Sequence, residues 1–346
     1  MSRRTRVVLC GLGPIGAGIA RLVLETDGLQ VVGATDIAPD KAGKDLGVVL
    51  GLGRRLRLKI EGNPARLLRR TKADVAVLST TSSAKSIKPQ VLALVAKGMH
   101  VVTTCEELSF AAPQNAATFR EIDRAAKRKK VSVLGTGVNP GYAMDALALM
   151  LTAPCARVDR VSVTRVVDAA TRRLPLQRKI GAGLNLNQFR RAITEGTVRH
   201  VGLPESAHMI AAGLGWKLER VEETIEPAIA PRDLDTEYLR VPAGAAAGVK
   251  QQARGFRNGQ AQPAISLDLQ MYVGAESPRD HVLIDGAPQI DMTIAGGVAG
   301  DIATAAIVVN AIPKLLAAPA GVVTMRDIPL VHRFNVLELK SLSKKR

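Results

Sequence analysis

Length, composition and charge bound the class of this protein. The chain has 346 residues, of which 47% are hydrophobic and 3% aromatic, and its formal net charge is +17. That length exceeds one ordinary compact domain, so we expect two. No run of the sequence approaches the roughly 20 apolar residues of a membrane-spanning helix, and its start lacks the features of a secretory signal. We therefore expect a cytoplasmic protein that does not bind a membrane.

Cysteine spacing and charge distribution narrow the partners further. Cys10, Cys105 and Cys155 are far apart, with no Cys-x-x-Cys pair and no histidine at ligand spacing, which predicts neither a disulfide framework nor a metal site. The basic residues are scattered in small clusters, and few aromatic side chains are present to stack on bases. We therefore expect no nucleic-acid partner, despite the positive charge.

Strands and helices alternate over the first part of the chain. Apolar runs at 6–10, 29–34, 73–78, 101–104 and 131–134 are typical of buried parallel strands. The segments between them carry apolar residues at helical spacing, as in 15–23, 89–98 and 115–130. This order predicts an α/β fold with a doubly wound parallel sheet, a Rossmann dinucleotide-binding domain over 1–150.

From about residue 157 the pattern changes to long alternating stretches. Hairpin turns are predicted at Asn258-Gly259 and Asp285-Gly286, and helices near 187–195 and 206–212 should cover one face of the sheet. We expect a second, α+β domain with an open antiparallel sheet over 151–300, whose other face is left for a partner subunit or the active-site cleft. Residues 301–346, a helix and a tail, should pack back on the first domain.

A glycine motif follows the first predicted strand and opens a helix. It reads Gly11-Leu12-Gly13-Pro14-Ile15-Gly16, and Asp36 ends the second strand about 20 residues later. The glycines allow a tight turn, close approach of a pyrophosphate and close helix packing, while the acidic residue accepts hydrogen bonds from the ribose. The motif predicts NAD(P)H binding by Gly11, Gly13, Pro14, Ile15, Gly16 and Asp36. Lys41 and Lys44 lie close enough to offset the carboxylate, so NAD and NADP both remain open.

Ligands of open parallel sheets bind beyond the carboxyl ends of the strands. Residues at these ends are therefore predicted to contact the cofactor: Ser79, Thr80, Thr81, Thr104, Cys105 and Asn139. Glu106 and Glu107 follow the fourth strand, and because side chains alternate, one of the two should face the cleft as a catalytic carboxylate. Asn139-Pro140-Gly141-Tyr142 should open a helix and place the Tyr142 ring at the same cleft.

Several segments together resemble the family of 2,4-diaminopentanoate dehydrogenases and native amine dehydrogenases, which have a Rossmann domain of the dihydrodipicolinate-reductase type. The resemblance spans most of the chain. Besides the glycine motif it rests on the segments 40–47, 104–108, 135–142 with Met144-Asp145, 175–181, 200–206 and 300–304. The glutamate pair and the Asn-Pro-Gly segment are the most discriminating of these.

The resemblance implies reversible oxidative deamination of an amine, or reductive amination of a ketone or aldehyde with ammonia, in a homodimer. Its glutamate near the nicotinamide matches Glu106 or Glu107, and we favour Glu106 because it leaves the strand first. Phe110 and Tyr142 are expected pocket walls. A diamino acid substrate is one alternative, with Arg165 or Lys179 facing its carboxylate. A polyol dehydrogenase is another, although the Glu-Lys-Pro usual at its strand end is replaced here by Glu106-Glu107-Leu108.

Overall fold

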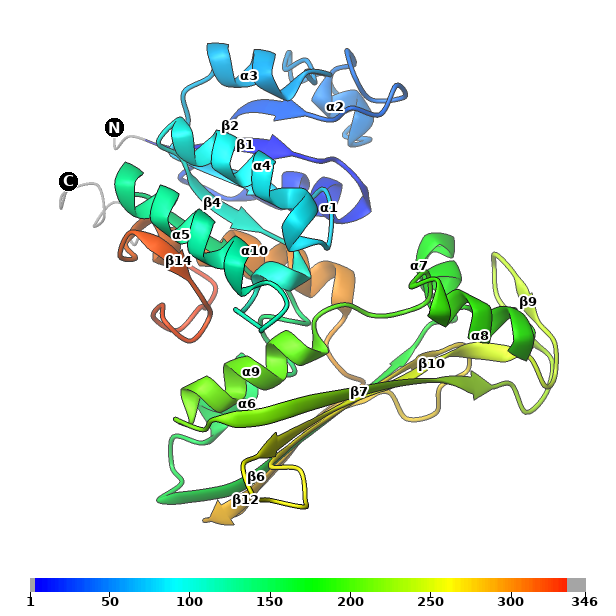
Figure 1. Cartoon of the computed structure of the whole chain (residues 1–346). Coiled ribbons are helices and arrows are strands. Elements are labelled where there is room, and N and C mark those ends of the chain that lie inside the picture. Colours follow the sequence, from blue (N-terminus) through cyan, green and yellow to red (C-terminus); the bar gives the residue numbers. More distant parts are fainter. Residues whose placement is uncertain (1–3, 335–346) are drawn as a thin grey trace. The chain divides into compact units, whose positions relative to one another are not determined.

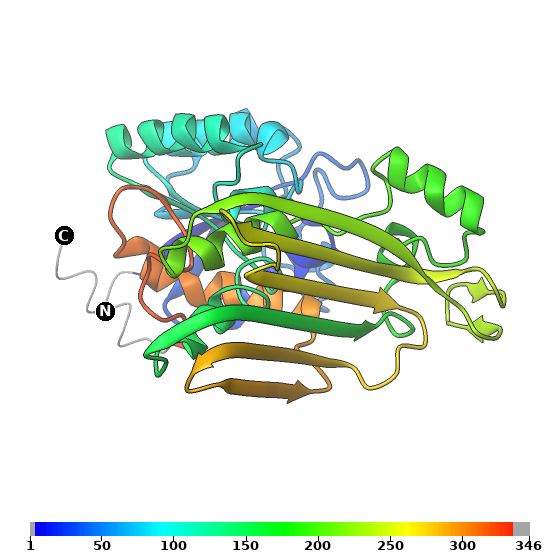
Figure 2. The same ribbon diagram turned by 60° about the horizontal axis from the view of Figure 1, so that its bottom comes forward.

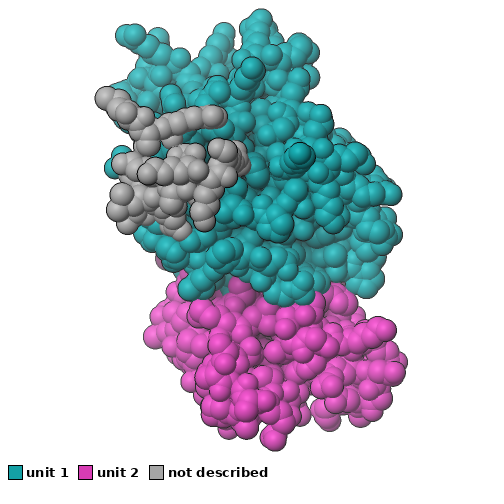
Figure 3. Space-filling view, turned by 90° about the vertical axis from the view of Figure 1, so that its left-hand side faces the viewer, with its two compact units in different colours: residues 1–142, 299–346 teal, residues 143–298 magenta. Residues whose placement is uncertain are grey.

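The computed structural model describes residues 4–334, which form two compact units (Figures 1 and 3). One unit combines the residues up to 142 with those from 299 onward, and the other spans 143–298. The end of the expected C-terminal segment, 335–346, lies outside the described residues. The units part at 142/143 rather than at 150/151, because helix α6 (Ala146–Leu151) contacts helix α9 (Leu203–Gly213) of the second unit.

The first unit is built on a six-stranded parallel sheet, in the order β14-β5-β4-β3-β1-β2. Its strands are β1 (Thr5–Cys10), β2 (Leu29–Thr35), β3 (Val75–Leu78), β4 (His100–Thr103), β5 (Ser132–Gly135) and β14 (Gly321–Val323). Its helices are α1 (Pro14–Glu25), α2 (Leu46–Val49), α3 (Pro64–Arg70), α4 (Ala84–Ala96), the 3-10 helix η1 (Glu106–Leu108), α5 (Ala116–Lys129) and α10 (Gly300–Leu316).

Alternate side chains of these strands belong to two different cores. In β1, Val7 and Leu9 pack with α1 and α10, whereas Val8 and Cys10 pack with α4 and α5. Helices therefore cover both faces of the sheet, as Figure 1 shows, and the apolar runs are buried on both sides. The predicted Rossmann sheet is confirmed. The strand order reverses between β1 and β3, which is where doubly wound sheets bind their ligands.

The second unit carries a six-stranded sheet in the order β13-β12-β6-β11-β10-β7. Its strands, with the small β8–β9 pair, are β6 (Arg157–Asp168), β7 (Leu218–Ile229), β8 (Leu234–Asp235), β9 (Arg240–Val241), β10 (Ala246–Arg257), β11 (Ile265–Tyr272), β12 (Arg279–Ala287) and β13 (Ile290–Ala295). Besides α6 and α9, its helices are α7 (Leu174–Lys179) and α8 (Leu186–Thr194). Figure 2 shows the six strands side by side.

One face of this second sheet forms the core with α8 and α9. Along β11, Ile265, Leu267, Leu269 and Met271 are buried, while the residues between them are partly exposed. This alternation is typical of a sheet with a single covered face. The prediction that 187–195 and 206–212 form covering helices is confirmed, and the helices are α8 and α9.

Two details of the second sheet differ from expectation. The sheet is mixed rather than wholly antiparallel, because β11 pairs in parallel with β6, which comes about a hundred residues earlier. Asp285-Gly286 is not a hairpin turn but an irregularity inside β12, and the chain reverses just beyond it, before Ile290. A Cβ atom at Gly286 would lie 2.1 Å from the Arg157 carbonyl oxygen, so this glycine serves the close approach of β6.

Among residues 4–334, no helix combines the length and the apolar character needed to cross a bilayer. The same residues contain no cluster of histidine, cysteine and acidic side chains suited to a metal ion.

Candidate functional site

The glycine motif forms the turn between β1 and α1. Gly11 has a φ of 88°, which favours glycine, and its N–H donates to the Thr35 carbonyl oxygen at 2.9 Å. A Cβ atom at Gly11 would lie 2.4 Å from the Ser79 carbonyl oxygen, and one at Gly16 would lie 2.1 Å from the Gly11 carbonyl oxygen. Both positions therefore exclude a side chain for reasons of packing alone.

Gly13 differs from these two glycines, because a Cβ atom there would meet no atom within 4 Å. It is also the residue that caps α1, and it supplies no side chain to accept hydrogen bonds from the first turn of that helix. The N-terminus of a helix attracts anions through its N–H groups and its dipole. The open side of the turn at Gly13 is thus suited to the approach of a phosphate.

Asp36 follows β2 and is tied to the glycine turn. Its Oδ2 accepts a hydrogen bond from the Leu12 N–H at 2.7 Å, its Oδ1 accepts one from the Ala38 N–H at 2.9 Å, and the Lys41 Nζ lies 3.5 Å from Oδ2. Partial burial alone would raise the pKa of Asp36, but the two hydrogen bonds and the lysine outweigh it and lower the pKa below its ordinary value. The group is a carboxylate at neutral pH.

A cavity of about 490 Å³ opens between the glycine turn and helices α3 and α4. Five predicted cofactor residues line it: Gly11, Gly13, Asp36, Ser79 and Thr80. Sequence reasoning missed its other wall, which includes Leu67, Leu68, Gln90 and Leu94. These residues come from two helices without a motif, so no local signal marked them. The cavity lies at the reversal of strand order, where an adenosine would be expected.

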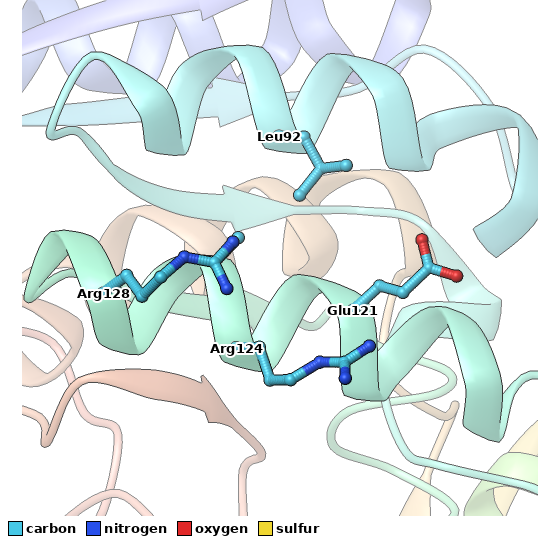
Figure 4. A pocket seen from close by; sticks show the side chains of 5 residues that line it. Leu92, Glu121, Arg124 and Arg128 are labelled. Carbon is cyan, nitrogen blue, oxygen red and sulfur yellow. The ribbon is translucent and has the colours of Figure 1, made fainter.

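A second, smaller cavity of about 250 Å³ lies between α4 and α5 and is lined by Leu92, Glu121, Arg124, Ala125 and Arg128 (Figure 4). Glu121 is paired across the two helices with Lys88 at 2.8 Å. None of the predicted site residues lines this cavity, and its arginines are exposed to solvent. The cavity at the glycine turn is therefore the better candidate for the site.

Three residues with hydroxyl groups directly follow β3 at the edge of the sheet. The Thr80 hydroxyl donates to the Gln90 Oε1 at 3.0 Å, and the Thr81 hydroxyl accepts from the Ser83 N–H at 3.3 Å. The Ser79 hydroxyl is buried and has no hydrogen-bond partner among residues 4–334.

Cys105 is buried, and burial together with the charge of Glu106 raises the pKa of its thiol. It is therefore a neutral thiol rather than a nucleophile.

The two glutamates begin the 3-10 helix η1, and both are half-buried. The carboxylate of Glu107 is held by the neighbouring helix: its Oε2 accepts a hydrogen bond from the Ala84 N–H at 2.8 Å, in the first turn of α4. Its main chain is held as well, because the Asn115 side chain donates to the Glu107 carbonyl oxygen at 2.7 Å. Glu107 thus occupies the place of a helix-capping carboxylate.

The loop after β5 folds tightly on itself and contacts α10. A Cβ atom at Gly141, whose φ is 123°, would lie 2.6 Å from the Gly137 nitrogen, and the Val138 N–H donates to the Thr304 hydroxyl at 3.3 Å. Asn139 is 8% exposed, and neither its Oδ1 nor its Nδ2 has a hydrogen-bond partner among the described residues. The Thr136 hydroxyl is also buried and has no hydrogen-bond partner among the described residues. Such unmatched groups are rare in native structures and call for an explanation.

The expectation that Asn139–Tyr142 opens a helix is wrong. These residues form a turn, and α6 begins only at Ala146. Asp145 ends the turn as the capping residue of α6: its Oδ1 accepts from the Ala146 N–H, and its Oδ2 accepts from the Ser206 hydroxyl at 2.7 Å. The positive φ of Gly141 keeps that residue out of a helix, and the non-helical backbone of Asp145, with φ −148° and ψ −75°, sets the start of α6 at Ala146.

The two expected pocket walls belong to the first unit. The Phe110 ring lies 5.7 Å from the guanidinium of Arg326, a cation–π contact with the C-terminal segment. Tyr142 is half-buried and is the last residue of this unit before the second begins. Their role as pocket walls stays a prediction.

The charged groups considered in the second unit have other partners. Arg165 is buried and forms an ion pair with Asp280, its NH1 lying 2.6 and 2.7 Å from the two carboxylate oxygens. Its guanidinium therefore binds a side chain of the sheet rather than a ligand. Lys179 is exposed. Burial, with the positive charges of Lys179, Arg165 and Arg199, lowers the pKa of His200 to about 3, so this ring is neutral at pH 7 and is no source of protons there.

Comparisons with known proteins agree with these features. A family model described as the 2,4-diaminopentanoate dehydrogenase C-terminal domain matches residues 142–342. The chain is 32% identical to the 2,4-diaminopentanoate dehydrogenase of Acetoanaerobium sticklandii over 338 residues, which cover 94% of each chain. Its fold is that of an amine dehydrogenase from Mycobacterium smegmatis, with a TM-score of 0.85 at 23% identity over 96% of this chain and 98% of the other. At fold level it also resembles GenD2 from gentamicin A biosynthesis in complex with NAD, with a TM-score of 0.54 at 14% identity over 85% of this chain and 73% of the other.

Proposed function

Because the chain belongs to the 2,4-diaminopentanoate dehydrogenase family, we propose that it is an NAD(P)-dependent amine dehydrogenase, which interconverts an amine with a carbonyl compound and ammonia. The family supplies the reaction class, and the first unit supplies residues suited to it. Both an unsubstituted small amine and a diamino acid are compatible with the family. Arg165, one residue proposed to bind a substrate carboxylate, is held by Asp280 instead.

Three features of the first unit fit a nicotinamide dinucleotide. The open side of Gly13 at the N-terminus of α1 accommodates the pyrophosphate. The cavity beside Asp36 accommodates the adenosine, whose ribose hydroxyls can donate to the carboxylate. The Asn139 amide, whose donor and acceptor atoms are both unmatched, is complementary to a carboxamide such as that of nicotinamide. When bound, the nicotinamide accepts or returns the hydride of the reaction.

We assign the acid–base role to Glu106, and the observation that carries the assignment is the capping bond of Glu107. The Glu107 carboxylate is engaged at the first turn of α4, whereas Glu106 is the first residue of η1 after β4 and is half-buried, which favours Glu106 for the acid–base role. In deamination it would take a proton from the substrate ammonium, so that a neutral amine can lose hydride. After releasing that proton to solvent, it would stabilise the cationic carbon–nitrogen double bond as a carboxylate and accept a proton from the water that adds to it. It would return this proton to the carbinolamine nitrogen, which leaves as ammonia while the hydroxyl loses its proton to form the carbonyl group.

The reaction class is tested by following NAD(P)H at 340 nm. Ketones and aldehydes are supplied with and without ammonia, and the reverse direction is run with simple amines, 2,4-diaminopentanoate and polyols, each with NAD and NADP separately. We expect turnover that requires ammonia. Turnover of polyols with no ammonia-dependent reaction would overturn the proposal in favour of a polyol dehydrogenase.

The division of roles between the glutamates is tested by Glu106→Gln and Glu107→Gln, a matched pair. We expect Glu106→Gln to lower kcat by about a hundredfold or more, with cofactor affinity and thermal unfolding unchanged. Glu107→Gln should instead lower the unfolding temperature and retain most of the activity, since an amide oxygen still accepts the Ala84 hydrogen bond but without the carboxylate's charge at the helix N-terminus. The opposite pattern would exchange the two assignments.

A further inference from the structure

We propose that Lys41 binds the 2′-phosphate of a phosphorylated dinucleotide, so that this site accepts NADP in spite of Asp36. The inference rests on the proposed function, because it refines which cofactor the glycine-turn site takes. An acidic residue at the end of the second strand ordinarily disfavours NADP, since a carboxylate repels a phosphate. Here the carboxylate has a cationic neighbour within the same cavity.

The geometry places Lys41 beside the cavity wall that an adenosine ribose would contact. Lys41 and Asp36 both line the cavity of about 490 Å³. The lysine Nζ lies 3.5 Å from the Asp36 Oδ2, and the two side chains are only 23% and 10% exposed. A pair this well shielded is screened less by salt than a surface pair, so the ammonium can act on a ligand in the cavity.

The loop that carries Lys41 is held by its own main chain. The Lys41 N–H donates to the Ala38 carbonyl oxygen at 3.0 Å, the Ala42 N–H donates to the same oxygen at 2.9 Å, and the Gly43 N–H donates to the Ile60 carbonyl oxygen at 2.8 Å. The lysine is therefore presented by an ordered turn, and little backbone freedom is lost when it binds a ligand.

Asp36 is held in place as well. Its two oxygens accept the Leu12 and Ala38 N–H groups, which bind the carboxylate whatever Lys41 does. The ammonium can therefore turn from Asp36 toward an incoming phosphate without leaving the carboxylate unpaired. The positive charge of Lys41 offsets the negative charge of Asp36, and the repulsion that would reject NADP is removed.

The structure separates Lys41 from Lys44, which the sequence left equivalent. Lys44 is exposed and does not line the cavity, although its backbone belongs to the same loop: its N–H donates to the Lys41 carbonyl oxygen at 3.0 Å. Lys44 is therefore a matched control. It has the same side chain in the same segment, and its removal changes the net charge by the same amount.

The test measures binding of two nucleotide fragments to the full-length protein by titration calorimetry. Adenosine 2′,5′-bisphosphate carries the phosphate in question, and 5′-ADP lacks it. We expect Lys41→Gln to weaken adenosine 2′,5′-bisphosphate about tenfold, the loss of one charge-assisted contact, and 5′-ADP less than twofold. Lys41→Arg should keep most of the affinity, and Lys44→Gln should change neither ligand. The same order is expected for NADP⁺ against NAD⁺.

The outcomes separate this inference from the proposed function. Equal losses for both fragments in Lys41→Gln, no loss, or the same loss in Lys44→Gln would overturn the role of Lys41. Wild-type protein that binds 5′-ADP but not adenosine 2′,5′-bisphosphate would overturn it as well, while leaving an NAD-dependent enzyme intact. Wild-type protein that binds neither fragment would refute the nucleotide site and the proposed function with it. Thermal unfolding of each variant confirms that the fold is retained.

Discussion

Gly13 and Gly16, each replaced by alanine in a separate variant, should affect different properties: cofactor affinity in the first variant and stability in the second. A methyl group at Gly16 would lie 2.1 Å from the Gly11 carbonyl oxygen and 3.0 Å from its carbon, both backbone atoms of the turn that the motif builds. Neither can move without shifting β1 or α1. Overpacking of this kind costs about 1–3 kcal/mol, so Gly16→Ala should lower the free energy of unfolding by that amount.

Gly13→Ala should have the opposite effect on stability. The backbone there has φ −61° and ψ 179°, which alanine adopts readily, and no atom lies within 4 Å of the new methyl group. Stability should be unchanged or rise by up to about 1 kcal/mol, because the unfolded chain loses freedom. The methyl group would nevertheless occupy the side from which a pyrophosphate approaches, so NAD⁺ affinity should fall by at least about tenfold, equivalent to about 1.4 kcal/mol.

Urea unfolding and calorimetric titration with NAD⁺ measure the two effects on the same preparations. Gly18→Ala is the control: Gly18 lies on α1, as Gly16 does, and its methyl group would lie at an ordinary 3.8 Å from the Ala305 Cβ of α10. This variant should lower neither the free energy of unfolding nor the NAD⁺ affinity. If Gly13→Ala destabilised the protein as much as Gly16→Ala, or left NAD⁺ affinity unchanged, the assignment of packing to one glycine and ligand approach to the other would be refuted.

Two further predictions concern the second unit. The pKa of His200 falls from its ordinary 6.5 to about 3 in the folded protein, through burial and neighbouring positive charges, so the unfolded chain binds the extra proton. Stability should therefore be fully present above pH 6.5 and fall by about 1.4 kcal/mol per unit as the pH drops toward 3. Urea unfolding at pH 7, 6 and 5 should show that the free energy of unfolding falls less steeply with decreasing pH in His200→Gln than in the wild type. Equal pH dependence in the two proteins would contradict this. Arg165→Met should cost about 3–5 kcal/mol by leaving Asp280 buried without its cation, and Arg165→Met with Asp280→Leu should recover much of it; a double variant no more stable than the single one would argue against the charge as the cause.

Local features of this protein could be predicted from its sequence, because they depend on residues a few positions apart. The glycine turn needs only a strand, a positive φ at Gly11 and a following helix, all of which leave a mark in a short stretch of sequence. The buried runs of β1 and its neighbours predicted a parallel sheet for the same reason, since a strand covered on both faces must be apolar throughout.

Features that depend on distant neighbours were beyond that reasoning. Asp285-Gly286 has the composition of a hairpin turn, but pairing with β6 makes it an irregularity inside a strand. Asn139–Tyr142 has the composition of a helix start, yet α6 begins at Ala146, where its cap Asp145 also accepts a hydrogen bond from the distant Ser206. In both cases contacts from other segments outweighed the local preference of the sequence.

The sequence by itself determined the class of domain, the glycine turn after β1 and the short list of acidic and basic residues proposed to act near it. Tertiary structure gives the members of that list different surroundings. Glu106 and Glu107 are adjacent and chemically alike, but the Glu107 carboxylate accepts a hydrogen bond from Ala84, 23 residues away at the N-terminus of α4. Lys41 lines the cavity at the glycine turn, whereas Lys44 does not. The physical reason is the same for both pairs. The residue type fixes the chemistry that is available to a side chain, whereas folding fixes which groups surround it.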